Sequence, residues 1–293
     1  MNIYNTKGTK KYTIPQLIIR GLLALVFAPF TLLLLGQIRR LRRYCKAKTY
    51  TVTQLPQEYK DRTNLIAHRG FRAVAPENTL PAFEAAGEAG FWGAENDIHR
   101  TKDGVWVVHH DCYTFRMMNK SRHIENTKFI TLQSFCYDNG SNFRDYPCLG
   151  IATLEEYLQV CARYGMKAFI ELKGKRNTQY YGEIVDMVSK YGVDATYISF
   201  EQIAITTMRR LTDAPLFYIV YKITQEAVDF ACSVENCGID FDGDDRDNQS
   251  RQMVDMIHNA GLDTAIWAVD DVELVKKYVD WGVKNITTNQ IVY

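Results

Sequence analysis

Two acidic residues separated by a single position, Glu95 and Asp97, are the part of this sequence best suited to chemistry. On a strand their side chains point to the same face, so the two carboxylates converge. Like charges held together inside a fold repel each other, and a hard divalent cation such as Mg²⁺ or Ca²⁺ relieves that repulsion. The same spacing recurs at Glu171 and Lys173, which adds a third carboxylate and a cation. We therefore predict a divalent-cation site made by Glu95, Asp97 and Glu171.

A second group of reactive residues follows the apolar run 65–67, where His68 and Arg69 begin a loop. Reactive side chains are commonly carried in this position, at the end of a buried strand in a barrel or an open sheet. A guanidinium offers a fork to phosphate oxygens and an ammonium offers a point charge, so Arg69 and Lys173 are suited to binding phosphate. Salt bridges to Glu95 or Asp97 are the competing interpretation of these two cations. With the carboxylates, the set indicates a site that cleaves phosphodiesters.

The order of short motifs along the chain resembles that of the glycerophosphodiester phosphodiesterase family. Its pattern is matched by HRG at 68–70, PENT at 76–79, E-x-D at 95–97, T-x-DG at 101–104 and HD at 110–111. Further matches follow in the expected order at Arg116, 153–156, Glu171, 199–200, Trp267 and 282–283. The resemblance covers about residues 62 to 293 and implies a barrel fold, hydrolysis of glycerophosphodiesters and dependence on a divalent cation.

The resemblance also implies roles for individual residues. His68 and His110 match the two histidines that the family uses for proton transfer, a task suited to a side chain whose ordinary pKa is ~6.5. Arg69 and Lys173 match the phosphate-contacting cations, and Trp267 resembles an aromatic wall against the glycerol group, with a core tryptophan as the alternative. In the family the glycerol 2-hydroxyl is thought to attack phosphorus, giving a cyclic phosphate that water opens. Which histidine is the acid and which the base stays open at this point.

The chain departs from the family pattern at three positions. Ala152 replaces a frequent proline, Asp270 stands where an asparagine is common, and Asn289 replaces the aspartate of a terminal TD. None of the three is a proposed metal ligand or acid/base residue. The departures therefore bear on substrate preference more than on the type of reaction.

Hydrophobic periodicity predicts an α/β fold. Short apolar runs alternate with longer helical patterns, which favours a parallel sheet with crossover helices. Eight strands and their helices in about 230 residues fit a (β/α)₈ TIM barrel, whose usual length is ~250 residues. The expected strands are 65–68, 93–98, 167–172, 195–200, 215–221, 238–242, 263–269 and 284–288. Residues 105–110 should add a locally paired strand, and 112–150 should form a long irregular excursion that shapes the substrate pocket.

An uncharged apolar run at 21–36 precedes the barrel, and residues 17–19 extend it if Arg20 snorkels to the interface. The extended run reaches the ~20 residues that span a bilayer. We predict a transmembrane or membrane-anchoring helix at 15–38; a buried helix and a cleavable signal peptide are the alternatives. The predicted organisation is an N-terminal tail at 1–14, the helix at 15–38, a basic juxtamembrane linker at 39–62 and the barrel domain at 63–293.

Flanking charges and cysteines bear on the side of the membrane. Basic residues are more numerous after the apolar run than before it, which predicts a cytoplasmic catalytic domain. The seven cysteines lack paired C-x-x-C spacing and fit a reducing compartment. The formal net charge of +1 gives no overall field to recruit nucleic acid, so the expected partners are a glycerophosphodiester or lysophospholipid substrate and membrane lipid.

Two other functions compete with glycerophosphodiester hydrolysis. A membrane anchor would hold the barrel at a lipid surface, where lysophospholipase D-like cleavage of lysolipids is an alternative. A catalytically silent, membrane-anchored binding module is the other. The complete set of acid/base and metal residues argues against the silent module, since such a relative could lose any of them.

Overall fold

The computed structural model describes residues 2–3, 12–13 and 50–293. The chain divides into two units, 1–47 and 48–293. In the first unit the described residues form two short antiparallel strands, β1 (Asn2–Ile3) and β2 (Tyr12–Thr13). The membrane helix predicted at 15–38 lies outside the described residues. Among the residues that are described, no helix is both long and apolar enough to cross a membrane.

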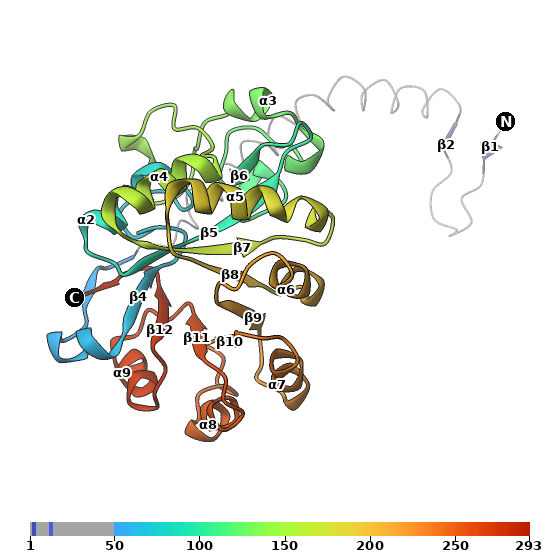
Figure 1. Cartoon of the computed structure of the whole chain (residues 1–293). Coiled ribbons are helices and arrows are strands. Elements are labelled where there is room, and N and C mark those ends of the chain that lie inside the picture. The colour runs from blue at the N-terminus through green and yellow to red at the C-terminus, as the bar shows by residue number, and fades with distance from the viewer. Residues whose placement is uncertain (1, 4–11, 14–49) are drawn as a thin grey trace. The chain divides into compact units, whose positions relative to one another are not determined.

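The second unit is built on a closed parallel barrel (Figure 1). Within residues 50–293, eight parallel strands follow one another around it, and pairing of the first with the second closes the ring. The predicted (β/α)₈ barrel is therefore confirmed. The strands are β4 (Asn64–Ala67), β5 (Gly93–Arg100), β7 (Lys167–Leu172), β8 (Ala195–Ser199), β9 (Leu216–Val220), β10 (Cys237–Asp242), β11 (Thr264–Trp267) and β12 (Asn285–Thr288).

Helices surround the barrel, as Figure 1 shows. Their ends follow local sequence signals. The helix α4 begins where the Thr153 hydroxyl accepts from the backbone N–H of Glu156, and it ends at Gly165, which adopts a φ of 66°. The helices are α2 (Leu80–Glu88), α4 (Leu154–Tyr164), α5 (Tyr181–Tyr191), α6 (Gln202–Arg209), α7 (Gln225–Cys232), α8 (Arg251–Asn259) and α9 (Val272–Asp280).

Apolar side chains fill the barrel interior below the carboxyl ends of the strands. A compact cluster of buried residues from five of the strands closes this space: Ile66, Phe169, Ile198, Phe217, Ile219 and Ala265. This part of the interior is therefore packed with apolar side chains.

The irregular segment after β5 is an ordered cap with a core of its own. The strand β6 (Trp106–Val108) pairs antiparallel with β5, as the sequence predicts. The short helix α3 (Phe129–Gln133) and three 3₁₀ turns at 114–116, 124–126 and 143–145 follow. Buried side chains, among them Met118 and Leu132, hold the segment together. The excursion is thus folded around its own small core.

The folded unit begins earlier than the predicted boundary at residue 63. Strand β3 (Thr53–Gln54) pairs in parallel with β13 (Ile291–Val292), and Leu55 is buried in the main core. A 3₁₀ helix (Gln57–Arg62) packs beside α9. The end of the predicted linker at 39–62 therefore belongs to the barrel. The sequence did not reveal this because a two-residue strand and a single buried leucine produce no periodic pattern.

Candidate active site

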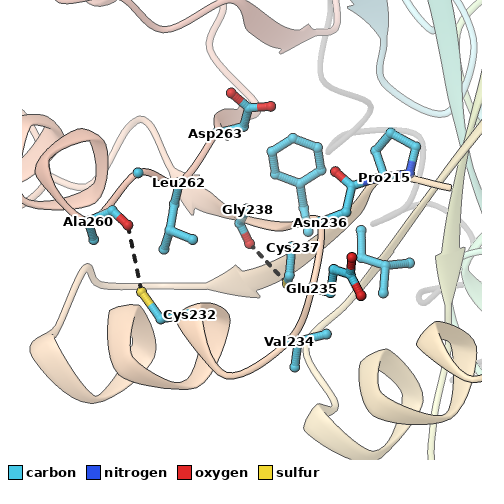
Figure 2. Close-up of a pocket in the computed structure, with 13 residues that line it drawn as sticks. Pro215, Cys232, Val234, Glu235, Asn236, Cys237, Gly238, Ala260, Leu262 and Asp263 are labelled. Atoms are coloured by element: carbon cyan, nitrogen blue, oxygen red, sulfur yellow. Dashed lines mark hydrogen bonds between the residues drawn. The ribbon is translucent and has the colours of Figure 1, made fainter. Parts of the chain in front are cut away.

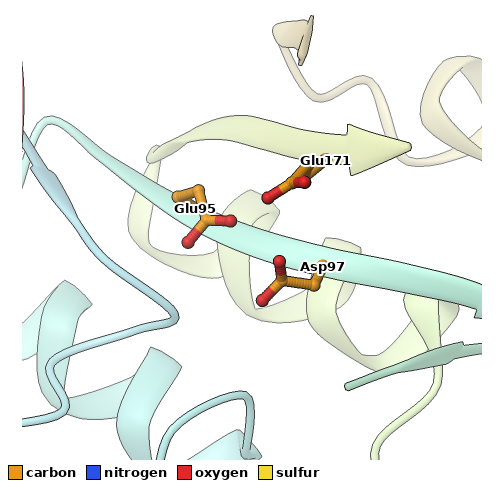
Figure 3. Close-up of side chains that lie close together, drawn as sticks. All are labelled: Glu95, Asp97 and Glu171. Carbon is orange, nitrogen blue, oxygen red and sulfur yellow. The ribbon is translucent and has the colours of Figure 1, made fainter. Parts of the chain in front are cut away.

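Three carboxylates meet inside the barrel near the carboxyl ends of β5 and β7 (Figure 3). Asp97 and Glu171 are direct neighbours in the register of the two strands, and Glu95 lies two residues before Asp97 on the same face. All three side chains are buried, and one oxygen from each lies within 4.8 Å of the others. The structure thus brings together the three metal ligands predicted from the sequence.

Two cations lie against these carboxylates. The Lys173 ammonium is 2.8 Å from Asp97 Oδ1 and 2.5 Å from Glu171 Oε1, and Arg69 Nε lies 3.5 Å from Asp97 Oδ2. Burial would raise the pKa of Asp97, but Lys173 and Arg69 hold it well below its usual value. Both the predicted role beside phosphate and the competing salt bridges are therefore compatible with their positions.

The pKa values of the other two carboxylates, Glu95 and Glu171, are shifted in the opposite direction. Burial and the neighbouring Asp97 raise the pKa of Glu95 well above its usual value, and burial raises that of Glu171 to about 7. Three carboxylates this close cannot all ionise cheaply, even beside Lys173 and Arg69. An oxygen-preferring divalent cation would let all three carry charge, so this donor set fits Mg²⁺ or Ca²⁺.

The loop after β4 adopts an unusual backbone to reach these carboxylates. Arg69 has a φ of 59°, and its backbone N–H donates to Glu95 Oε2 at 2.8 Å. Gly70 follows with a φ of 77°, and a Cβ there would lie 2.8 Å from the backbone of Ala82. Asn78, with a φ of 58°, donates from Nδ2 to Asp97 Oδ2 at 2.6 Å. The HRG and PENT motifs therefore anchor the first two metal-ligand candidates.

Glu77 is the hub of the charged network around the site. Its buried carboxylate lies 3.0 Å from Arg69 Nη1, 2.7 Å from Arg72 Nη2 and 2.6 Å from Arg116 Nη2. Burial would raise its pKa, but the three guanidinium groups hold it well below its usual value. One carboxylate thus fixes three arginines, two from the loop after β4 and one from the segment after β6.

The two candidate histidines lie at opposite ends of this network. His110 Nδ1 donates to Asp111 Oδ1 at 2.7 Å, and Asp111 in turn accepts from Arg116 Nε at 2.5 Å. His68 Nδ1 lies 2.7 Å from Asn289 Oδ1. Burial and the charges of Arg69 and Arg72 hold the pKa of His68 well below its usual value, so His68 is neutral near pH 7.

One cavity connects these groups. It is lined by His68, Arg69, Glu95, His110, Glu171, Lys173, Asp240, Thr287 and an apolar set comprising Ile198, Phe200, Ile219, Tyr221 and Trp267. The rings of Phe200 and Tyr221 both meet the indole of Trp267, with centroids 5.7 and 5.6 Å away. The cavity therefore has a charged side suited to phosphate and an aromatic side suited to an organic group.

Other polar groups are buried nearby without joining the charged network. His109, beside His110, is buried, as is His99 on β5. Asp240 on β10 lines the cavity, and burial and the charge of Glu171 raise its pKa well above its usual value. Sequence reasoning missed Asp240, although its place on a predicted strand with apolar neighbours could have indicated an inward side chain.

A larger hollow lies at the opposite end of the strands, between α7 and α8 (Figure 2). Its lining comes from the segments that lead into β9, β10 and β11 and includes Pro215, Cys232 and Asp263. None of the predicted site residues contributes to it. The chemistry of this barrel is therefore concentrated at the carboxyl ends of its strands, where active sites of TIM barrels lie.

The fold and the cavity together define a TIM-barrel protein with a buried three-carboxylate cluster, two histidines and two phosphate-suited cations. The sequence matches the model of the glycerophosphoryl diester phosphodiesterase family over residues 68–292. The chain belongs to this family. The resemblance inferred from the ordered motifs is therefore confirmed.

Individual relatives agree with this assignment. The chain is similar to mouse glycerophosphodiester phosphodiesterase 1, with 36% identity over 118 residues, which are 39% of this chain and 35% of the mouse protein. The chain thus spans about a third of the length of that curated relative.

Solved structures share the fold. A phosphodiesterase of Oleispira antarctica in complex with the product sn-glycerol-3-phosphate has a TM-score of 0.69 and 25% identity; the match covers 81% of this chain and 96% of that one. A glycerophosphodiester phosphodiesterase of Parabacteroides distasonis has a TM-score of 0.62 and 26% identity, covering 78% and 93% of the two chains.

Removing the charge of Glu77 should strongly destabilise the protein. In a Glu77→Gln variant the three arginines would face one another without their shared anion, and loss of one partner of a buried ion pair costs about 3–5 kcal/mol. Denaturant unfolding measures the change. Glu84→Gln is the matched control, because its ion pair with Arg163 is exposed and worth about 0–1 kcal/mol. Equal stability of the two variants would contradict the role of Glu77.

Proposed function

We propose that this chain hydrolyses glycerophosphodiesters to glycerol phosphate and an alcohol. The observation that carries the proposal is one cavity lined by His68, His110, Arg69, Lys173, Glu95 and Glu171. Asp97 lies directly beside the last two carboxylates. The glycerol phosphate bound by the Oleispira antarctica relative supports the same product here.

Different side chains of the site would bind the phosphate and the cation. Arg69 and Lys173 would bind the phosphoryl oxygens and stabilise the charge that develops on them. Glu95, Asp97 and Glu171 would hold a divalent cation, Mg²⁺ or Ca²⁺. When bound, such a cation polarises a phosphoryl oxygen and lowers the pKa of a coordinated hydroxyl or water.

The two histidines would move the protons. His68, neutral because of its lowered pKa, would take the proton of the attacking hydroxyl. His110 would protonate the leaving alcohol from Nε2, because its Nδ1–H donates to the Asp111 carboxylate. Water would then open the cyclic phosphate, giving a proton to His110 while His68 returns its proton to the glycerol 2-oxygen. The aromatic side of the cavity, with Trp267, would face the glycerol group.

The direct test is release of glycerol phosphate from glycerophosphocholine and glycerophosphoethanolamine with Mg²⁺, with Ca²⁺ and with EDTA. We expect turnover with a cation and none with EDTA. His110→Ala should lower kcat by about 10²–10⁴-fold, the usual contribution of a general acid, while cation binding is retained.

His258→Gln is the matched control for this variant. His258 lies on α8, away from the cavity, and bonds Thr264, so wild-type turnover is expected. Near-normal turnover of His110→Ala with cation binding intact would contradict the scheme. Absence of turnover by the wild-type protein with any cation would contradict the proposed function.

Lysolipid cleavage is a second candidate, favoured by one observation. Tyr221, on the aromatic side of the cavity, is 64% exposed and offers an apolar surface at the mouth. Such a surface could contact an acyl chain. Turnover of lysophospholipid compared with that of water-soluble glycerophosphocholine distinguishes the two activities, and turnover of neither substrate would favour the silent binding module.

We also propose that residues 15–38 anchor the chain in a membrane, with the barrel on the cytoplasmic side. The apolar run and the basic residues around it support this proposal. The full chain should stay with membranes after alkaline carbonate extraction, and a reporter at the carboxyl terminus should be active on the cytoplasmic side only. Recovery of the full chain in the soluble fraction would contradict the anchor.

A further inference from the structure

Two of the positions at which the sequence departs from the family pattern contact each other. Asp270 follows β11 and Asn289 follows β12. The Nδ2 group of Asn289 donates to Asp270 Oδ2 at 2.8 Å, and the backbone N–H of Asn289 donates to Asp270 Oδ1 at 2.8 Å. The two departures therefore form one unit, in which the aspartate and the asparagine have exchanged places relative to the family pattern.

The other end of the Asn289 amide faces His68. Asn289 Oδ1 accepts from Arg72 Nη1 at 3.2 Å and lies 2.7 Å from His68 Nδ1. A carboxylate only accepts and a guanidinium only donates, so Asp270 and Arg72 together fix which way the amide points. An amide oxygen cannot donate. His68 Nδ1 must therefore carry the hydrogen, which leaves Nε2 with the lone pair.

The exchange also moves a charge away from the imidazole. An aspartate at 289 would place its carboxylate directly against His68. In this chain the carboxylate belongs to Asp270, and the Asn289 amide lies between it and His68. The groups that act on His68 are then Arg69 and Arg72 from the loop after β4, Asp97 from β5, and the neutral amide of Asn289. In this setting His68 stays neutral and depends on Asn289 for its orientation.

We propose that Asp270 is a positioning residue for His68: by orienting the Asn289 amide it holds the Nδ1–H tautomer and makes Nε2 the atom that transfers protons. The kinetic consequence rests on the proposed function, because it requires that His68 acts as the base. The Nδ1–H tautomer of His68 is expected whether or not the chain has the proposed activity. No step of the reaction passes through Asp270.

Three variants test the kinetic consequence. Asp270→Asn lets the amide at 289 turn and should lower kcat/KM by about 10-fold or more, the usual effect of losing a group that orients an imidazole. Asn289→Asp places two carboxylates against each other and should also lose activity. The double variant Asp270→Asn/Asn289→Asp restores complementary donors and acceptors, so it should recover most of the loss.

The pH profile gives a readout that a purely structural role would not produce. In the double variant a carboxylate adjoins His68 and favours the imidazolium, so the acid limb of kcat/KM should move to higher pH than in the wild type. A double variant no more active than Asp270→Asn, or one with an unshifted acid limb, would overturn the proposal.

Nitrogen-15 NMR of the imidazole tests the tautomer without substrate. The wild type should show His68 as the Nδ1–H tautomer, and Asp270→Asn should show a mixture; a His68→Asn protein assigns the signals. Asp280→Asn, on the exposed side of α9, is the matched control and should resemble the wild type. An unchanged tautomer in Asp270→Asn overturns the proposal. A wild type that lacks phosphodiesterase activity overturns only the proposed function.

Discussion

The structure of the site depends on one buried carboxylate, that of Glu77, which three arginines share. Through Arg116 and Asp111 it is connected to His110, and through Arg72 and Asn289 it is connected to His68. A third arginine, Arg69, reaches from the same carboxylate to Asp97. A single anion therefore sets the positions of both histidines and of one cation beside the metal-ligand candidates. Burial makes this interaction strong, because an unpaired charge there would be costly.

The barrel supplies the rigid frame for this network. Parallel register places Asp97 beside Glu171, and the period of two along β5 brings Glu95 to the same face. The cap after β5 carries Arg116 itself, and Asn139 Nδ2 of the cap donates to the carbonyl of Arg116, while Ser141 Oγ donates to that of Arg72. The long excursion thus holds two of the three arginines in place.

The sequence predicted the parts of the site that follow a local period. The three carboxylates could be found because alternate residues of a strand share a face, and the strand order followed from apolar runs. It could not predict the contacts of Asn289 with His68 and Arg72, because these residues are 221 and 217 positions apart. Nor could it predict the contact between Glu77 and Arg116, which are 39 positions apart.

The account's central claim is that the three buried carboxylates form a divalent-cation site. Calorimetric titration of the cation-free protein with Mg²⁺ and with Ca²⁺ tests it most directly. The account predicts saturable binding of at least one of these cations that is lost in Asp97→Asn and kept in Asp186→Asn, an exposed position on α5. Binding that is absent from the wild type, or that survives unchanged in Asp97→Asn, would contradict it.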